Sequence, residues 1–465
     1  MLYFLFDWLD RLYDLPGFGV FRYISFRAVM AALFSLFFSV VIGKKIIEIL
    51  KSRLVGERIR DLGPESHKKK AGTPTMGGVI IILAVIVPAL LWGNLKNAYV
   101  ILMIVATLWM GLIGFADDYI KVFRKDKKGL HGKFKIYGQV GLGLIVGLTM
   151  TLHPDFRGVK PRLNPDSGLR VNELLQRYGF EKNDKIISAD GVDPQKIDAG
   201  KEPAVSRYEV ERNGKTTRVD VPVGARSVVA RQIFGHGDVA FATSTDIPFF
   251  KFHAFNYGKL VFWDDPDHVW SRALYILVCV FIVTAVSNGV NITDGLDGLA
   301  AGTTAIAVGA LGVFAYLSGN FIFSGYLNIS YIPHAGELFI FSAALIGACV
   351  GFLWYNTYPA QVFMGDTGSL ALGGAVGALA LMTKKELLLP LICGIFFVES
   401  LSVIIQVSYF KYTKRKYGSG RRIFLMSPLH HHYELKGWAE PKIVARFWII
   451  AVILTLAAFS TLKLR

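Results

Sequence analysis

Runs of apolar residues long enough to cross a lipid bilayer recur along the whole chain. They constrain the fold more than any other feature, because a transmembrane helix needs about 20 mostly apolar residues. At 53% hydrophobic residues, the chain is more apolar than an ordinary soluble protein. The runs predict an all-α polytopic membrane protein with ten transmembrane helices, at residues 26–42, 75–92, 98–116, 136–152, 271–287, 299–317, 338–354, 369–382, 387–410 and 444–462.

The charged residues give these helices an orientation. The formal net charge is +16, yet segment 154–270 holds 17 Lys+Arg against 17 Asp+Glu. The excess lies largely in loops 44–74, 117–135 and 411–442, where basic residues outnumber acidic ones by 9 to 4, 7 to 3 and 8 to 2. With ten helices these loops share one side, which the positive-inside rule makes cytoplasmic. Such a charge pattern indicates cytoplasmic loops and no nucleic-acid partner.

Segment 154–270 is expected on the outer, periplasmic side. It separates helices 1–4 (residues 1–153) from helices 5–10 (residues 271–465). Apolar and polar residues alternate around Asn213-Gly214, which predicts a β-hairpin, and 171–178 is expected to be a short helix. The order of these features resembles a PDZ domain over about 169–223. A small α/β insert of another fold is the alternative.

Polar side chains gather between the fifth and sixth predicted helices. Four amides and carboxylates recur there at every third position: Asn288, Asn291, Asp294 and Asp297. Polar groups beside hydrocarbon are costly unless they are paired, so they usually mark a site. A capped, glycine-broken turn accounts for one or two of the four side chains. We therefore interpret the stretch as the edge of a functional site.

Two adjacent carboxylates close the third predicted helix. With that helix ending at Ala116, Asp117 and Asp118 lie at its negative C-terminal end, where carboxylates are disfavoured. They need compensation from a bound cation or from the lysines that follow, such as Lys121. Ion pairing explains one of the two carboxylates, and use in a site is expected for the other.

Asp366 stands directly before the eighth predicted helix and is the only carboxylate of the polar loop 356–369. A lone aspartate at this position is by default an N-cap. A helix N-terminus is also where phosphate binds, and Mg²⁺ commonly takes one or two carboxylates, waters and substrate phosphate oxygens. We therefore predict Asp366 as a ligand of Mg²⁺ shared with a substrate phosphate.

Basic side chains lie in loops on the same side. Lys70 ends a run of lysines whose usual partners are lipid headgroups, although one of them could hold a substrate phosphate. His430, His431 and His432 are adjacent and cannot all turn to one tetrahedral zinc ion, so we expect them to contact phosphate or a leaving group. Oxygen ligands beside basic groups predict a magnesium-dependent enzyme that joins a soluble phosphate-bearing donor to a lipid.

A resemblance to the phospho-N-acetylmuramoyl-pentapeptide-transferase family is carried by five stretches. These are PESHKKKAGTPTMGG at 64–78, DDY at 117–119, NGVNITDGLDGLA at 288–300, FLWYNTYPAQVFMGDTGSLALGG at 352–374 and SPLHHHYELKGWAEPKIVARFW at 427–448. The resemblance implies a bacterial inner-membrane enzyme of peptidoglycan synthesis that uses Mg²⁺. It would transfer phospho-N-acetylmuramoyl-pentapeptide from UDP-N-acetylmuramoyl-pentapeptide to undecaprenyl phosphate, giving lipid I and UMP.

The resemblance also implies roles for single residues. Asp366 would hold the metal, Asp117 would deprotonate or orient the lipid phosphate, and Asp118 would help to position it. The residues implied to shape the nucleotide and diphosphate pocket are Lys70, Asn288, Asp294, Asp297, Asn356 and Phe363. Those implied to hold phosphates or the sugar are Asn291, His430, His431 and His432. Direct attack and a covalent aspartyl intermediate both stay open, as does a homodimer.

Two alternatives belong beside this prediction. A polyprenyl-phosphate N-acetylglucosamine-1-phosphate transferase would share the aspartate motifs, but the histidine triplet favours the muramoyl-peptide enzymes. A transporter or lipid-binding scaffold would place charges near the bilayer midplane on broken helices, whereas these carboxylates gather at one side. The family normally has a short outer loop where this chain has 154–270. The insert therefore suggests an added role, such as docking a cell-wall protein.

Overall fold

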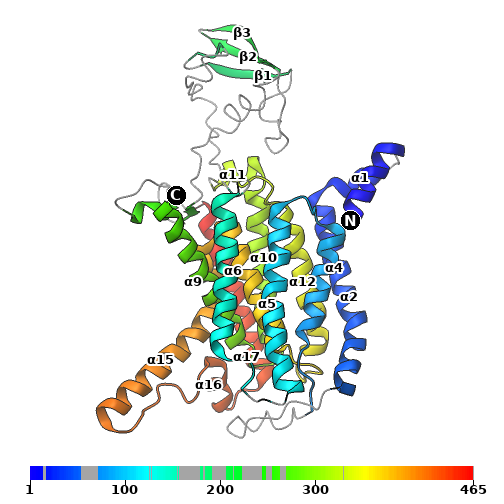
Figure 1. Cartoon of the computed structure of the whole chain (residues 1–465). Coiled ribbons are helices and arrows are strands. Elements are labelled where there is room, and N and C mark those ends of the chain that lie inside the picture. The colour runs from blue at the N-terminus through cyan, green and yellow to red at the C-terminus, as the bar shows by residue number, and fades with distance from the viewer. Residues whose placement is uncertain are drawn as a thin grey trace.

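A computed structural model of the chain shows a bundle of long helices with a small β-sheet beyond one end (Figure 1). It describes residues 1–13, 17–53, 72–124, 126, 128–153, 156, 179–181, 184–190, 206–212, 214–222, 243–247, 254–261, 269–327 and 329–463. Lys70 and the predicted helix at 171–178 lie outside the described residues.

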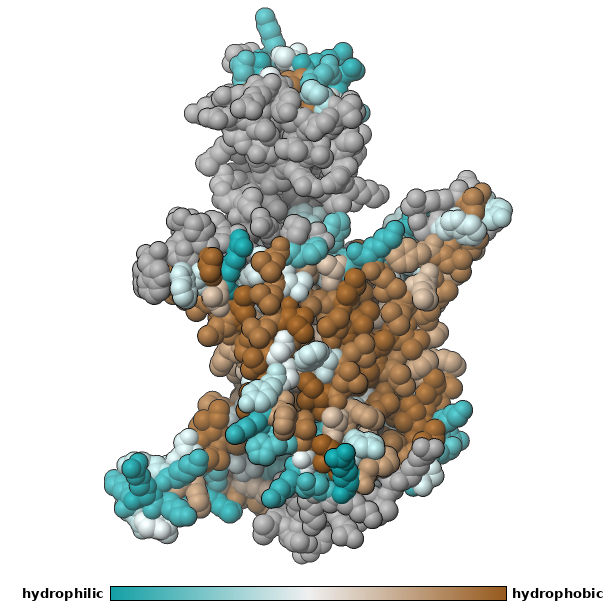
Figure 2. All heavy atoms as spheres, viewed as in Figure 1, coloured by the Kyte–Doolittle hydropathy of each residue, from teal (hydrophilic) through white to brown (hydrophobic). Residues whose placement is uncertain are grey.

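Helices stand at all ten predicted positions, which confirms a polytopic helical membrane protein. Eight of the described helices are long and apolar enough to cross a membrane: α2 (Ile24–Arg53), α5 (Ala98–Phe123), α6 (Gly132–Leu152), α9 (Val269–Thr293), α10 (Leu299–Ser318), α12 (Glu337–Asn356), α15 (Gly394–Tyr417) and α17 (Glu440–Ser460). The other two positions hold the shorter apolar α4 (Gly78–Trp92) and the glycine- and alanine-rich α13 (Gly365–Met382). Apolar side chains cover the flank of the bundle (Figure 2).

Short helices flank these long ones. They are α1 (Leu2–Tyr13), η1 (Phe18–Arg22), η5 (Tyr257–Leu260), α11 (Phe321–Leu327), η6 (Glu386–Leu388), α14 (Leu389–Ile392), α16 (Leu429–Leu435) and η7 (Thr461–Lys463).

Helix α13 forms the buried centre of the bundle, with α4, α5 and α9 packed around it. Glycines let its first turn approach two neighbours at backbone distance. A Cβ on Gly78 of α4 would lie 2.0 Å from the amide nitrogen of Gly368, and one on Gly114 of α5 would lie 2.1 Å from the carbonyl oxygen of Asp366. These contacts fix where Asp366 stands relative to α5.

Two predicted helix ends are wrong in a way that matters for function. Helix α5 continues past Ala116 to Phe123, so Asp117 and Asp118 lie inside the helix and not at its negative end. The pairing of Asp117 with Lys121 one turn later supports this continuation. Helix α9 likewise runs on to Thr293 and carries the first two members of the polar row.

The ninth predicted helix is broken near its start. The chain passes through η6 and α14 before α15 begins at Gly394, with Cys393 between the two α-helices. Beyond this break, α15 leaves the bundle at an angle (Figure 1). The predicted single helix 387–410 is therefore corrected to two short elements followed by a long, projecting one.

The insert contains an antiparallel sheet in the order β1 (Lys185–Ala189), β2 (Arg207–Arg212) and β3 (Lys215–Asp220). The predicted hairpin is confirmed, since Arg212 pairs with Lys215 across a two-residue turn in which Gly214 has a φ of +77°. Figure 1 shows this sheet apart from the bundle, at the end opposite α16. The likeness to a PDZ domain stays a prediction.

A second hairpin of the insert rests on the bundle itself. It comprises β4 (Ser244–Asp246) and β5 (Ala254–Asn256). The Asp246 carboxylate forms a buried ion pair with Lys385, which follows α13. The hydroxyl of Thr245 donates to the Lys384 carbonyl at 3.0 Å. The insert is thus fastened to the end of α13 opposite Asp366.

Candidate active site

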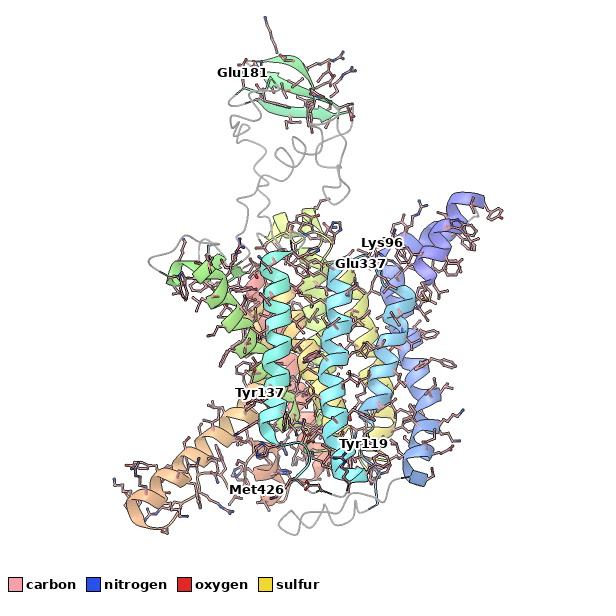
Figure 3. All side chains as sticks on the ribbon, viewed as in Figure 1. Lys96, Tyr119, Tyr137, Glu181, Glu337 and Met426 are labelled. Atoms are coloured by element: carbon pink, nitrogen blue, oxygen red, sulfur yellow. The ribbon has the colours of Figure 1, made fainter. Side chains whose placement is uncertain are left out.

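Three carboxylates from two helices meet at one end of the bundle. Asp117 and Asp118 come from α5 and Asp366 from the first turn of α13, and oxygens of all three lie within 4.8 Å of one another. Asp117 and Asp118 are buried, and Asp366 is half-buried. Figure 3 labels Tyr119, which follows the pair on α5, at the end where Met426 also lies, opposite Lys96 and Glu337. The structure therefore brings together the three residues predicted to be catalytic.

Two lysines bridge this carboxylate cluster. The Nζ of Lys121 lies 2.5 Å from Asp117 Oδ2 and 3.1 Å from Asp366 Oδ2. The Nζ of Lys135, from α6, lies 3.1 Å from Asp117 Oδ1 and 2.5 Å from Asp366 Oδ2. The three carboxylates outnumber the two ammonium groups by one negative charge, which favours a further cation. Lys121 was predicted as an ion-pair partner, but Lys135 was missed.

Asp118 caps the helix that carries Asp366. Its carboxylate accepts hydrogen bonds from the Thr367 amide (2.8 Å), the Thr367 hydroxyl (2.6 Å) and the Asp366 amide (3.2 Å). The N-cap position of α13 belongs to Met364, so the N-cap interpretation of Asp366 is wrong. These two amides are already used by Asp118, and a phosphate would have to displace that carboxylate to reach them.

The two amides of the polar row that α9 carries make separate contacts. Asn291 donates to Asp366 Oδ1 and to the Ser369 hydroxyl, each at 2.8 Å, and so belongs to the carboxylate cluster. Asn288 exchanges two 3.1 Å hydrogen bonds with Gln139 of α6. Asn291 therefore holds the predicted metal ligand in place, while Asn288 joins α9 to α6.

Two buried polar residues hold the neighbouring loops together. Asp297 Oδ2 accepts a hydrogen bond from the Ala360 amide at 3.0 Å. Asn356 accepts from the Gly298 amide at 3.0 Å and donates to the Val362 carbonyl at 2.9 Å. In this structure Asp297 and Asn356 therefore fasten the turn after α9 to the loop before α13.

Asp294 lies in the turn after α9 and Phe363 in the loop before α13, the two segments that these contacts join. Asp294 and Phe363 are both half-buried. The Phe363 amide donates to the Pro74 carbonyl at 2.9 Å, and its own carbonyl accepts from the Gly77 amide at 2.8 Å. The segment that follows Lys70 in sequence therefore pairs, through Pro74 and Gly77, with the loop that leads to Asp366.

Helix α16 carries the histidine triplet, and a buried carboxylate accepts hydrogen bonds from the amides of its first turn. Glu399 of α15 accepts hydrogen bonds from the amides of Leu429 (2.8 Å) and His430 (3.2 Å). Its Oε2 also lies 3.2 Å from His430 Nδ1. The capping role of Glu399 was missed from sequence. The available signal for this capping role was a carboxylate inside an apolar helix.

The three imidazoles have three different surroundings. The His430 ring is buried against Gly295, where a Cβ would lie 2.2 Å from Nε2. His431 Nδ1 lies 2.6 Å from a Glu434 oxygen, and His432 Nδ1 accepts from the Leu425 amide at 3.1 Å. Burial, with Lys436 nearby, lowers the pKa of His432 below its usual range. The triplet is therefore no single metal site.

Membrane-spanning helices with a cluster of carboxylates and lysines at one end define the class, a polytopic membrane protein with a charged site at one end of its bundle. A model of glycosyl transferase family 4 matches residues 238–384. Signature 1 of the phospho-N-acetylmuramoyl-pentapeptide-transferases matches residues 70–82. Proteins of that name from Flavobacterium psychrophilum and Flavobacterium johnsoniae are each 49% identical to the chain over 466 residues, and one from Parabacteroides distasonis is 47% identical over 480. Each comparison covers 100% of both proteins. The chain belongs to the phospho-N-acetylmuramoyl-pentapeptide-transferase family.

The family expectation is therefore confirmed against both alternatives. The same comparisons refine the expectation about the insert, because these relatives align along their full length and include the region between residues 154 and 270. A segment of this size is shared with them and is not peculiar to this chain.

Proposed function

We propose that the chain transfers phospho-N-acetylmuramoyl-pentapeptide from UDP-N-acetylmuramoyl-pentapeptide to undecaprenyl phosphate, forming lipid I and releasing UMP. One observation carries the proposal: the cluster of Asp117, Asp118 and Asp366 bridged by Lys121 and Lys135 in a member of this family. Carboxylates and ammonium groups side by side suit a reaction that moves a phosphate between two anionic partners.

The donor set fits Mg²⁺, which prefers oxygen ligands and commonly uses one or two carboxylates with substrate oxygens. Asp366 would be its principal ligand, because Asn291 steadies one of its oxygens and Asp118 is already engaged by α13. Asp117 is the second carboxylate within reach. Bound there, the ion would neutralise charge on the donor diphosphate.

The chain's own residues suggest how the phosphates are handled. An oxygen of the lipid phosphate bonds to the sugar-linked phosphorus of the donor, the bond to the bridging oxygen breaks, and UMP leaves with that electron pair. Asp117, which both lysines contact, would orient the lipid phosphate and take its proton. Lys121 and Lys135 would contact phosphate oxygens. One-step transfer and a covalent aspartyl intermediate use the same groups.

The remaining predicted residues complete the pocket in this proposal. Asp294 and Phe363 would face the nucleotide from the loops that Asp297 and Asn356 fasten. The other residues proposed to contact the donor are Lys70, Asn288, Asn291, His430, His431 and His432. Asp118 acts through α13 and is a positioning residue.

The orientation is part of the proposal. The basic loops 44–74, 117–135 and 411–442 favour a cytoplasmic site, with the β1–β3 sheet in the periplasm. The insert would dock a cell-wall protein there. Deleting 159–239 should keep UMP release and lose a periplasmic interaction. A deletion that kept every interaction would refute this role.

Donor selectivity tests the proposed reaction. We would measure UMP release by the purified protein with undecaprenyl phosphate and Mg²⁺, offering UDP-N-acetylmuramoyl-pentapeptide or UDP-N-acetylglucosamine. Turnover with the muramoyl donor alone, abolished by a chelator and restored by Mg²⁺, is the expected result. Turnover with UDP-N-acetylglucosamine alone would show the activity of a polyprenyl-phosphate N-acetylglucosamine-1-phosphate transferase instead. No UMP release with either donor would contradict an enzymatic role.

A further inference from the structure

The projecting end of α15 and the segment after it carry a concentrated positive charge. Six basic residues and no acidic residue fall between 411 and 426. All six side chains are exposed: Lys411, Lys414, Arg415, Lys416, Arg421 and Arg422. We call these six residues the basic tip. Figure 1 shows that end of α15 pointing away from the bundle, and Figure 2 shows the hydrophilic surface there.

The basic tip has a defined structure. The segment after α15 turns at Gly418, which has a φ of +75°, and runs back along the helix. Thr413 accepts from the Arg421 amide at 2.8 Å. Gln406 accepts from the Ile423 and Phe424 amides at 3.0 Å and donates to the Phe424 carbonyl at 3.1 Å. Two side chains of α15 thus clasp the returning segment, and the charges are held on a fixed hairpin.

Along α15 the exposed side chains change in the order of a membrane leaflet. Leu401 and Ile404 are exposed near the bundle, as a helix surrounded by lipid tails requires. Tyr412 and Tyr417 are exposed further along, and tyrosine is typical of the membrane–water interface. Lys416 lies 5.7 and 5.3 Å from the centres of these two rings. The basic tip then falls at headgroup level.

The charges of the basic tip have no carboxylate partner among the described residues of the chain. Clusters of Lys and Arg beside a membrane helix attract anionic lipids. We propose that the basic tip docks onto anionic phospholipid headgroups of the leaflet that faces the carboxylate cluster. Only the identity of that leaflet rests on the proposed function.

Docking of the basic tip onto anionic headgroups would also fix the position of the start of α16. The clasped segment continues to Leu425, whose amide donates to His432 Nδ1, and then to Leu429 and His430, whose amides are held by Glu399. The basic tip and the histidine triplet therefore belong to one continuous hairpin on α15.

A fluorescent label on the tip tests the docking without any turnover. Ser419 is exposed, and all three native cysteines are buried, so Ser419→Cys gives one accessible thiol for a fluorophore. The protein would be placed in phosphatidylcholine nanodiscs with or without phosphatidylglycerol, each carrying a headgroup spin label that quenches nearby fluorophores. We expect phosphatidylglycerol to raise the quenching by about twofold or more and salt to reverse the gain.

A matched pair of charge variants shows whether the charges of the basic tip, or exposed lysines in general, cause the gain in quenching. K414Q/R415Q/K416Q should lose the gain, and K44Q/K45Q/K51Q, which removes three exposed lysines of α2, should keep it. If the first variant fails to fold, R421Q/R422Q replaces it with the same expectation. Quenching that is the same with and without phosphatidylglycerol would overturn lipid docking. Quenching that changes only when UDP is added would also overturn it, because the tip would then respond to a nucleotide. Because the signal is independent of catalysis, its failure would leave the proposed reaction untouched.

Discussion

Asp118 on α5 accepts hydrogen bonds from both the amide and the hydroxyl of Thr367 on α13, at 2.8 and 2.6 Å. One buried carboxylate therefore joins two helices and caps the second of them. Asp366, the predicted metal ligand, precedes Thr367 in that same first turn. The position of the metal ligand thus depends on a residue that need not touch the metal.

Removing one of these hydrogen bonds should loosen the site without dismantling it. Thr367→Val keeps the side-chain shape and the amide contact but loses the hydroxyl donor. We expect kcat to fall roughly tenfold, since a hydrogen bond to a charged group contributes about 1.5–3 kcal/mol. Thr367→Ser, which restores the hydroxyl, should recover most of the activity. Equal kcat values for the valine variant and the wild type would refute this positioning role.

The lysines should compete with a divalent cation and yet be needed for turnover. Lys135→Gln removes an ammonium group that contacts Asp117 and Asp366. We expect Mn²⁺, measured by electron paramagnetic resonance, to bind about fivefold more tightly, because one nearby positive charge is lost. UMP release should fall roughly a hundredfold. Weaker Mn²⁺ binding in this variant would mean that the lysine supports the metal instead of competing with it.

The close approach of α5 to α13 leaves no room for a methyl group. Gly114→Ala would place a Cβ 2.1 Å from the Asp366 carbonyl oxygen, so the helices must move apart. We expect a loss of stability of about 1–3 kcal/mol in detergent and a larger loss of activity. Gly132→Ala is the control, since a Cβ there meets no atom within 4 Å. Thermal unfolding and UMP release, measured for both variants, check the prediction.

The buried ion pair under the insert should be sensitive to the removal of one partner. Asp246→Ala leaves Lys385 charged and buried, which costs about 3–5 kcal/mol. Asp246→Ala combined with Lys385→Met removes both charges and should recover part of that loss, because the Ser330 amide and hydroxyl still lose their acceptor. Thermal unfolding in detergent distinguishes the two variants. A double variant as unstable as the single one would show that the charges themselves are not responsible.

Much of the fold could be predicted because hydrocarbon thickness sets helix length. Ten apolar runs gave ten helix positions, and the hairpin around Gly214 followed from local turn chemistry. The ends of α5 and α9 could not be predicted by hydropathy, because both helices continue beyond their apolar runs as polar helix. Pro390 and Gly394 flank the break at Cys393, but a proline in the first turn of a helix is tolerated, so it did not mark the break within the predicted helix 387–410.

The candidate site was only partly predictable from sequence. Asp117 and Asp118 were singled out because they were expected at the negative end of a helix, and Asp366 because it is a lone carboxylate at a helix N-terminus. The first premise was wrong, since α5 continues to Phe123, yet all three residues belong to the cluster. Lys135 was missed because its contact depends on how α6 folds back beside α5. The histidines of the triplet were predicted not to share one metal ion, and successive residues on a helix indeed point about 100° apart. Each imidazole of α16 therefore meets a different neighbour.

UMP release by two matched aspartate variants tests the central claim most directly. Asp366→Asn removes a charge from the cluster, whereas Asp126→Asn removes an exposed carboxylate from the loop between α5 and α6. With Mg²⁺, undecaprenyl phosphate and UDP-N-acetylmuramoyl-pentapeptide, we predict near-complete loss of UMP for the first variant and wild-type release for the second. Wild-type release by a folded Asp366→Asn protein would show that the reaction takes place elsewhere in the molecule.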